Sequence, residues 1–201
     1  MAVTTVNTFG TSTLGVLGIR GYFRKEGEYD WIDLGIVKNW EPQDETEELE
    51  IDGARTGLRV VHEVIPVSAS LAYSFDSENP NDEHILGLWQ GADMTTDGSS
   101  GLSAPISFEA TSGELMWVRQ NSASGKPSVL IYHPSASIRR DGQTGTPGEE
   151  AAGLSFQATV TADETYTIPV GVDPGEPSAP YGYLYRVPTS GLDAAETTVS
   201  A

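Results

Sequence analysis

The chain of 201 residues contains no cysteine, which excludes disulfides and thiolate-bound zinc or iron–sulfur sites. No stretch approaches the roughly 20 apolar residues of a membrane-spanning helix, so we expect no membrane partner. Basic residues are scarce, because 11 Lys and Arg stand against 29 Asp and Glu, a formal net charge of −18. Conventional nucleic-acid binding neutralises phosphates with cations, so this balance disfavours a protein that grips DNA.

The acidic residues are concentrated in residues 26–52, where eleven carboxylates are accompanied by a single base, Lys38. Packed carboxylates without partners are very unfavourable, so we expect this stretch to face solvent, salt or a lumen. An ordinary solvated acidic face would explain the same pattern. Adaptation to high salt, from a halophilic source, is a further explanation, since only three of the basic residues are lysines.

The clearest local pattern is a strand followed directly by a short helix. In residues 66–76 apolar residues alternate with small polar ones, and Asp76 belongs to the polar face, which we expect to be wet. Asn79 is the expected helix cap, Pro80 suits the first helical position, and Gly91 is expected to end the helix. The expected apolar face of the helix comprises Ile85, Leu86, Leu88 and Trp89.

The rest of the first half also favours strands. A strand at 16–25 carries Gly18 and Gly21, which indicate a bulge or a close backbone approach. Pro42 is expected to break strand pairing, ahead of an acidic strand at 45–51. Residues 52–64 have no clean period and are expected to form a long loop between two strands.

The second half predicts short strands at regular spacing, as in a sandwich or barrel. These strands are expected at 106–110, 114–121, 128–133, 154–161 and 183–187, with a loop over 135–153. We therefore expect one β domain over 16–187. A flexible N-terminal arm at 1–15 and a mobile C-terminal tail at 188–201 are expected to flank it.

No catalytic or metal-binding signature is present. His62, His84 and His133 lack the His-Glu-x-x-His spacing of a zinc helix, so we interpret them as exposed polar residues. The oxygen-rich stretch 76–82 lacks the pattern of a calcium loop, and helix capping explains it more simply. We expect no enzyme, and we assign no catalytic, cofactor-binding or metal-ligating residue.

The order of elements resembles the major tail tube protein of long-tailed, siphovirus-like phages and related viruses. The resemblance lies in the Tyr-Asp-Trp-Ile-Asp-Leu-Gly segment at 29–35, the glutamate-rich strand at 45–52, the loop with Arg-Thr-Gly, and the strand and helix after it. It covers roughly residues 16–163, and the later residues and the Arg139-Arg140 loop depart from it. It implies a mainly β fold of two packed antiparallel sheets, as a sandwich or barrel, flanked by one short α-helix.

The resemblance also implies a function. Subunits of that family form six-fold rings that stack head to tail into a hollow tail tube, which conducts double-stranded DNA without binding it specifically. The implied partners are further copies of the chain and the tail terminator, tail tip and tape measure proteins, and no cofactor is implied. The implied location is the virion tail, after assembly in the host cytoplasm. One sheet of each subunit joins those of its neighbours into an inner barrel, so we expect an isolated copy to be an incomplete barrel.

Two sets of side chains are candidate functional residues in this interpretation. The expected lining of the lumen, where carboxylates repel DNA phosphates, comprises Glu45, Glu47, Glu48 and Glu50. Arg55 and Arg59 lie in the segment that reaches the adjacent ring, and we expect them to pair with acids there.

Two alternatives stay open at the level of sequence. The first is a viral decoration or adhesin module that binds a host surface through Tyr181, Tyr183 and Tyr185, whose spacing is more simply explained by one face of a strand. The second is a carbohydrate-binding or calcium-dependent β-sandwich enzyme. Its sugar-stacking platforms would be Trp40, Trp89 and Trp117, although Trp89 is better explained as a core residue.

Overall fold

The computed structural model describes residues 17–55, 58–96, 101–121, 128–144, 153–172, 175 and 177–187. Within these ranges the fold is mainly β with one short helix, as expected from the sequence. In chain order the elements are β1 (Leu17–Lys25), β2 (Ile32–Arg55), β3 (Leu58–Ser77), α1 (Glu83–Gln90), β4 (Thr95–Thr96), β5 (Leu102–Ser103), β6 (Thr111–Asn121), β7 (Ser128–Thr144), β8 (Gly153–Val160) and β9 (Tyr183–Val187). The expected arm at 1–15 and tail at 188–201 lie outside the described residues.

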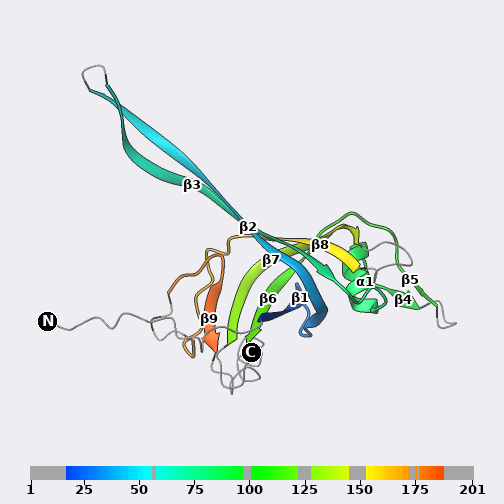
Figure 1. Ribbon diagram of the computed structural model, residues 1–201. Helices are drawn as coiled ribbons and strands as arrows, with labels where there is room; N and C mark the ends of the chain where they lie inside the picture. Colours follow the sequence, from blue (N-terminus) through cyan, green and yellow to red (C-terminus); the bar gives the residue numbers. More distant parts are fainter. Residues whose placement is uncertain are drawn as a thin grey trace.

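Six strands form a closed ring of antiparallel pairs (Figure 1). The strand order is β6-β1-β2-β3-β8-β7-β9, and β6 also pairs with β7, which closes the ring. β9 pairs with β7 at residues 128–132 and so lies outside the ring. The two expected layers are therefore walls of one sheet. The expectation of an incomplete barrel is wrong, because one chain closes its own barrel and pairs the strand edges there.

The barrel interior holds the main hydrophobic core. Phe23, Trp117 and Phe156 are fully buried, and Phe75 is 2% exposed. The Phe75 ring stacks on Phe156 at 5.3 Å between centroids and meets Trp117 edge-on at 5.0 Å. Such ring pairs contribute about 0.5–1.5 kcal/mol each beyond the burial of their area. Gly21 lets the Trp117 ring approach β1, because a Cβ at Gly21 would overlap that ring.

β3 follows the predicted alternation where its side chains are described. Tyr73 and Phe75 are buried, and Leu71 packs against the core. Asp76, expected on the wet face, is instead 8% exposed. Asn39 Nδ2 and Ser155 Oγ each donate a hydrogen bond to its carboxylate at 2.6 Å. The carboxylate is buried because two neighbouring elements supply the donors that burial requires.

Helix α1 begins three residues later than the sequence predicted. Asp82, not Asn79, is the N-cap, and its Oδ1 accepts hydrogen bonds from the backbone N–H groups of His84 and Ile85. Gly91 ends the helix in the left-handed conformation, with φ of 68°, as predicted. The predicted apolar face is confirmed, since Ile85 and Leu88 are buried in the main core, while Leu86 and Trp89 pack against it.

Three other predictions about strands are wrong. Pro42 does not break the pairing of β2, because it lies opposite Tyr73, and the irregularity falls between Lys38 and Glu41. Residues 104–110 belong to no strand. β7 continues through most of the expected loop at 135–153, because β8 pairs with its second half.

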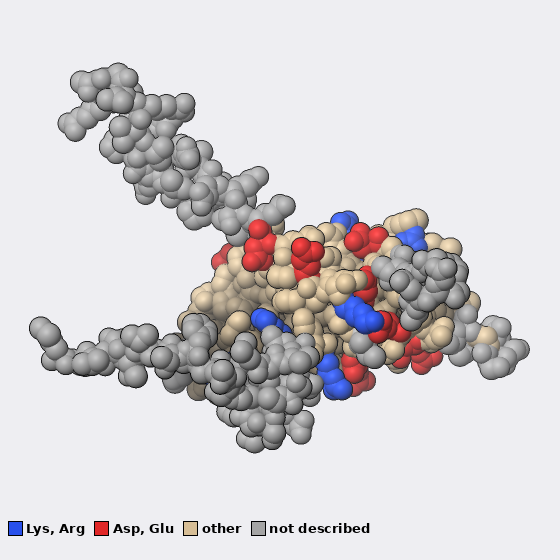
Figure 2. Space-filling view, viewed as in Figure 1, with Lys and Arg blue, Asp and Glu red and all other residues tan. Residues whose placement is uncertain are grey.

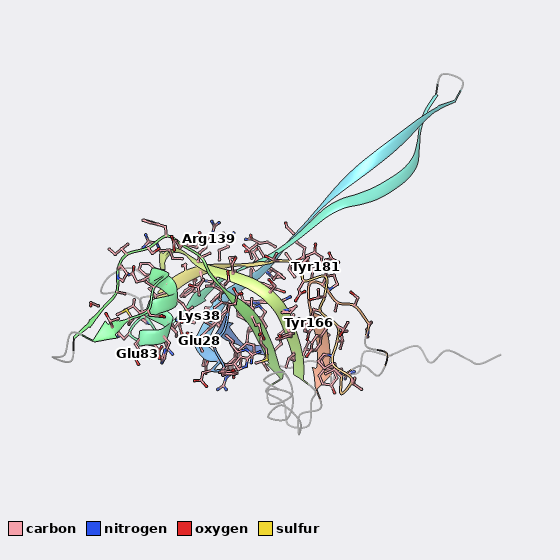
Figure 3. The ribbon with its side chains drawn as sticks, turned by 180° about the vertical axis from the view of Figure 1, so that it is seen from behind. Glu28, Lys38, Glu83, Arg139, Tyr166 and Tyr181 are labelled. Carbon is pink, nitrogen blue, oxygen red and sulfur yellow. The ribbon has the colours of Figure 1, made fainter. Side chains whose placement is uncertain are left out.

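The region after Asp163, which the resemblance leaves unassigned, covers the outside of the barrel wall. Met116, Val118, Leu130 and Tyr132 form a second cluster with Tyr183 of β9. Partly buried side chains from the segment after β8 pack over it, namely Tyr166, Ile168 and Val172. This segment therefore forms an apolar layer over the outer face of β6, β7 and β9, near the labelled Tyr166 (Figure 3).

Candidate functional site

The distal halves of β2 and β3 leave the barrel as a long hairpin. β1 pairs with β2 only as far as Ile36, and β8 pairs with β3 only from Leu71. Beyond these points the two strands pair with each other up to Arg55 and Leu58. Residues 45–55 alone span roughly 35 Å at about 3.3 Å per residue. Figure 1 shows this hairpin extending well away from the barrel.

The candidate residues named from the sequence lie on this hairpin, although its form was not predicted. Residues 52–64, expected to be a loop, are strand apart from residues 56 and 57, which lie outside the described residues, and they are paired except at an irregularity at His62. The lumen candidates all lie on the β2 side, paired in register with β3: Glu45, Glu47, Glu48 and Glu50. Arg55 and Arg59 lie at the far end, paired with Leu58 and Ala54. The side chains of these six residues are not among those the structure describes.

A two-stranded hairpin of this length presents two strand edges. Among the described residues, no further strand pairs with β2 after Ile36 or with β3 before Leu71. Such edges are templates for pairing with another chain, and an isolated two-stranded ribbon is marginally stable in water. The hairpin is therefore the part of the described fold that most needs a partner surface.

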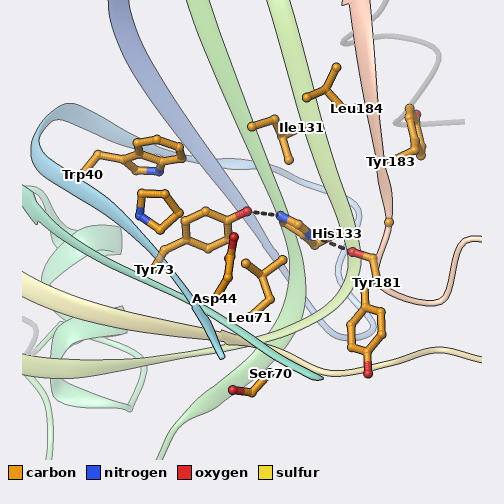
Figure 4. Close-up of a pocket in the computed structure, with 12 residues that line it drawn as sticks. Trp40, Asp44, Ser70, Leu71, Tyr73, Ile131, His133, Tyr181, Tyr183 and Leu184 are labelled. Carbon is orange, nitrogen blue, oxygen red and sulfur yellow. Dashed lines mark hydrogen bonds between the residues drawn. The ribbon is translucent and has the colours of Figure 1, made fainter. Parts of the chain in front are cut away.

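A pocket of about 500 Å³ opens at the base of the hairpin (Figure 4). Its walls come from β2, β3, β7 and the start of β9, and they are largely apolar. The lining residues are Trp40, Pro42, Asp44, Ser70, Leu71, Tyr73, Ile131, His133, Tyr181, Gly182, Tyr183 and Leu184. The rim residues Tyr181 and Leu184 are 36% and 64% exposed. Their exposure keeps the pocket open to solvent on the β9 side.

His133 connects the pocket floor to the loop before β9. It is 3% exposed, which corrects the prediction of an exposed histidine. Its Nδ1 lies 2.6 Å from the Tyr181 carbonyl oxygen, which can only accept, so Nδ1 carries the proton. Burial lowers the pKa of His133, so the ring is neutral near pH 7 and Nε2 is an acceptor. The Tyr73 hydroxyl therefore donates a hydrogen bond to Nε2 at 2.8 Å, drawn as the dashed line between Tyr73 and His133 in Figure 4.

The hydrogen bonds of His133 favour a structural role in the pocket over a catalytic one. Both ring nitrogens of His133 are already hydrogen-bonded, so neither faces a substrate. Burial, with a smaller contribution from the Asp44 carboxylate, raises the pKa of Tyr73 to about 12, so the hydroxyl stays protonated. Among the described residues no group of three His, Asp or Glu side chains could hold a metal ion.

The residues proposed for the alternative functions are mostly packed. Trp117 is fully buried, and Trp89 packs against the core and donates a hydrogen bond to the Gly142 carbonyl at 2.9 Å. Neither offers a ring face as a sugar platform. Tyr183 and Tyr185 lie on one face of β9 in the outer cluster, which confirms the simpler explanation for these two, whereas Tyr181 precedes β9 and is exposed.

Acidic side chains are spread over the barrel surface (Figure 2). The described acids of the 26–52 stretch are exposed, as predicted: Glu26, Glu28, Asp30, Asp33, Glu41 and Asp44. His84 is also exposed, as predicted, whereas the side chain of His62 lies outside the described part. In the described ranges no helix has the length and apolar character that crossing a bilayer requires.

Comparison with known proteins gives little. No family model and no curated protein matches the chain. Among solved structures, it is similar to a chain in "Structure of the phage p2 baseplate in its activated conformation with Sr", with 10% identity and a TM-score of 0.34. The match covers 84% of this chain and 61% of that one, so it spans less than two thirds of the solved chain. A similarity at this level does not define a family.

Proposed function

We propose that the protein is a structural subunit of a viral tail tube, in which copies of the chain form six-fold rings and the rings stack into a hollow conduit for DNA. The observation that carries the proposal is the β2–β3 hairpin, which extends from a closed barrel. Both edges of the hairpin are unpaired among the described residues. The six-fold rings and their stacking are proposed from the resemblance of the order of elements to that of tail tube proteins.

The closed barrel changes how a ring would be built. The six-strand ring of one copy has no open side to share with a neighbour. Among the described residues, the long edges left for pairing are those of the hairpin, from Val37 onward on β2 and up to Ser70 on β3, and the short edge of β9 that faces away from β7 is also unpaired. Hairpins from adjacent copies can align edge to edge, adding strand to strand around an axis. The inner wall of the proposed tube therefore consists of hairpin stems, with the barrels outside.

The acidic stem suits a channel for DNA. Glu45, Glu47, Glu48 and Glu50 lie on the β2 side of the stem. Carboxylates on the inner wall repel phosphates over about 8 Å at physiological salt, so the polymer slides without adhering. A high-resolution map of a ring would show some of these four side chains facing the axis. Placement of all four on the outer surface would contradict this assignment.

The far end of the hairpin suits contact between rings. Arg55 and Arg59 lie there, roughly 35 Å from the hairpin base by strand geometry. The chain carries 18 more acids than bases (29 − 11), so a neighbouring ring offers many carboxylates as partners. The end components of the tube, namely tail terminator, tail tip and tape measure proteins, are the other proposed partners, and the virion tail is the proposed location. The proposed role is structural and needs no catalytic group or cofactor.

The test is negative-stain microscopy of the purified protein and of a variant without the hairpin. Asp44 and Leu71 are cross-strand partners, so an Asn-Gly turn can join them in place of residues 45–70. We expect rings or tubes from the natural chain, and a folded barrel without rings from the variant. Circular dichroism is the control for folding. Isolated particles of the natural chain from low to molar salt, or tubes formed by the variant, would overturn the proposal.

A further inference from the structure

An exposed apolar pair lies at the end of the barrel that carries α1. Ile106 and Phe108 are 72% and 80% exposed, in a segment that belongs to no strand. The segment is held against the C-terminal end of α1, because the backbone N–H of Ser107 donates to the Gln90 carbonyl at 3.1 Å. Two large apolar side chains exposed within three residues indicate a surface that another molecule covers.

The pocket at the hairpin base has the size and character to receive this pair. Its volume is about 500 Å³, whereas an apolar cavity of about 150 Å³ already holds a benzene ring. Leu71, Tyr73 and Ile131 line it, and the exposed Leu184 extends its apolar rim. A phenyl ring with a neighbouring aliphatic side chain therefore fits inside.

The charges at the two places are complementary. The Arg140 guanidinium lies 3.8 Å from the centroid of the Phe108 ring, and no ion pair of Arg140 is present in the described part of the chain. Asp44 lines the pocket and likewise forms no ion pair within the described ranges. Trp40 Nε1, also at the pocket, is buried and has no hydrogen-bond partner among described residues. A docked peptide segment from the other surface would bring a cation to Asp44.

The two surfaces lie at opposite ends of one copy. Figures 1 and 3 both place α1 at one end of the barrel and β9 at the other, and Figure 3 labels Glu83 and Tyr181 at these two ends. One copy therefore cannot fill its own pocket with this pair. Contact between two different surfaces of identical chains is heterologous, and it generates closed rings when the rotation between copies closes.

We propose that Phe108 and Ile106 of one copy occupy the pocket at the hairpin base of the next copy, with Arg140 facing Asp44 of that neighbour. This contact deepens the proposed function, on which it rests, by naming a second junction between subunits of one ring. The hairpin edges align the inner wall, and the knob-and-pocket contact fixes the angle between adjacent barrels.

Cysteine cross-linking tests the contact directly, because the chain contains no cysteine of its own. A Glu109→Cys protein and a Leu184→Cys protein, distinguished by a size tag, are mixed and oxidised; Glu109 is exposed next to Phe108, so the ring that enters the pocket is kept. We expect a mixed disulfide dimer, at least about tenfold more abundant than with a Tyr29→Cys partner, because a disulfide needs Cα atoms within about 7 Å. Tyr29 is 92% exposed and is the matched control for collisions. A mixed dimer no more abundant than this control would overturn the proposal, including the case in which another part of the chain or a small molecule fills the pocket.

A charge exchange tests the same contact in the assembly without a cross-link. We expect Asp44→Arg and Arg140→Asp each to raise the concentration needed for assembly about tenfold, because like charges then face each other. The combined variant is expected to restore assembly to within about threefold of the natural chain. Absence of this rescue would overturn the pairing. If the natural chain forms tubes but the cysteine variants give no mixed dimer above the control, the knob-and-pocket contact fails and the proposed function stands. If the cross-link forms but no ring or tube appears, the proposed function fails and the contact stands.

Discussion

The buried His133 predicts that acid destabilises the barrel in a defined pH range. Burial lowers the pKa of this residue in the folded protein below its ordinary value of about 6.5. Below about pH 6.5, His133 is therefore protonated in the unfolded chain while it stays neutral in the folded chain. The free energy of unfolding then falls with decreasing pH, by up to about 1.4 kcal/mol per pH unit until the folded pKa is reached. Above about pH 7 both states are neutral at this residue, and the effect disappears.

The structure explains why the folded state resists this proton. Nε2 already accepts the Tyr73 hydroxyl proton, and Nδ1 already donates to the Tyr181 carbonyl. A second ring proton would place an N–H against the Tyr73 hydroxyl and a charge among largely apolar walls. The hydrogen bond from Nδ1 to the Tyr181 carbonyl offsets only part of this penalty.

The assay compares urea unfolding of the natural chain, His133→Gln and His84→Gln, followed by tryptophan fluorescence near pH 7.5 and about pH 5.5. The natural chain is expected to lose more stability than His133→Gln over this interval, by up to about 1.4 kcal/mol, because the carboxylates titrate alike in both. His84→Gln is the matched control for replacing a histidine, because His84 is exposed. Equal pH dependence in the natural chain and His133→Gln would refute the reasoning.

Three further predictions concern packing, capping and assembly. Gly21→Ala places a methyl group 2.8 Å from Leu34 Cδ1 and is expected to lower the free energy of unfolding by about 1–3 kcal/mol, whereas Gly18→Ala, with open space around it, is the control; similar melting temperatures for the two would argue against the close approach. Asp82→Ala removes the helix cap and is expected to cost about 1 kcal/mol in urea unfolding, and no measurable loss would contradict the capping assignment. Reversing Arg55 and Arg59 to Glu is expected to leave rings intact but shorten or abolish stacked tubes in micrographs, most strongly at low salt, and unchanged tube length across salt would exclude their role between rings.

Much of the fold could be predicted from local sequence patterns. The alternation in β3, the apolar face of α1 and the glycine that ends it are each set by a few adjacent residues, and each is confirmed. The exposure of the described acids of the 26–52 stretch also follows from sequence, since Lys38 is the single base among them. Errors of a few residues arose where two cap candidates compete, as at Asn79 and Asp82, because only the backbone geometry chooses between them.

The candidate site was predicted only in part. The sequence located the acidic strand and the two arginines, but not the hairpin that joins them, because pairing between two strands leaves no periodic signal in either one. The pocket was missed entirely. His133 carries no local sign of burial, since its partners lie 60 and 48 residues away in the chain. The period-2 aromatics near β9 were its only advance signal.

The sequence by itself determined the mainly β class, the single short helix among the described elements, the absence of cysteine chemistry and the acidic surface, since these depend on composition and on neighbours along the chain. Only the tertiary structure decided that β6 pairs with β7 and closes the barrel, that β2 and β3 continue beyond it as a hairpin, and that a pocket forms at the hairpin base. These features depend on contacts between residues far apart in the chain, and the energy of such contacts cannot be estimated from any one segment of the sequence.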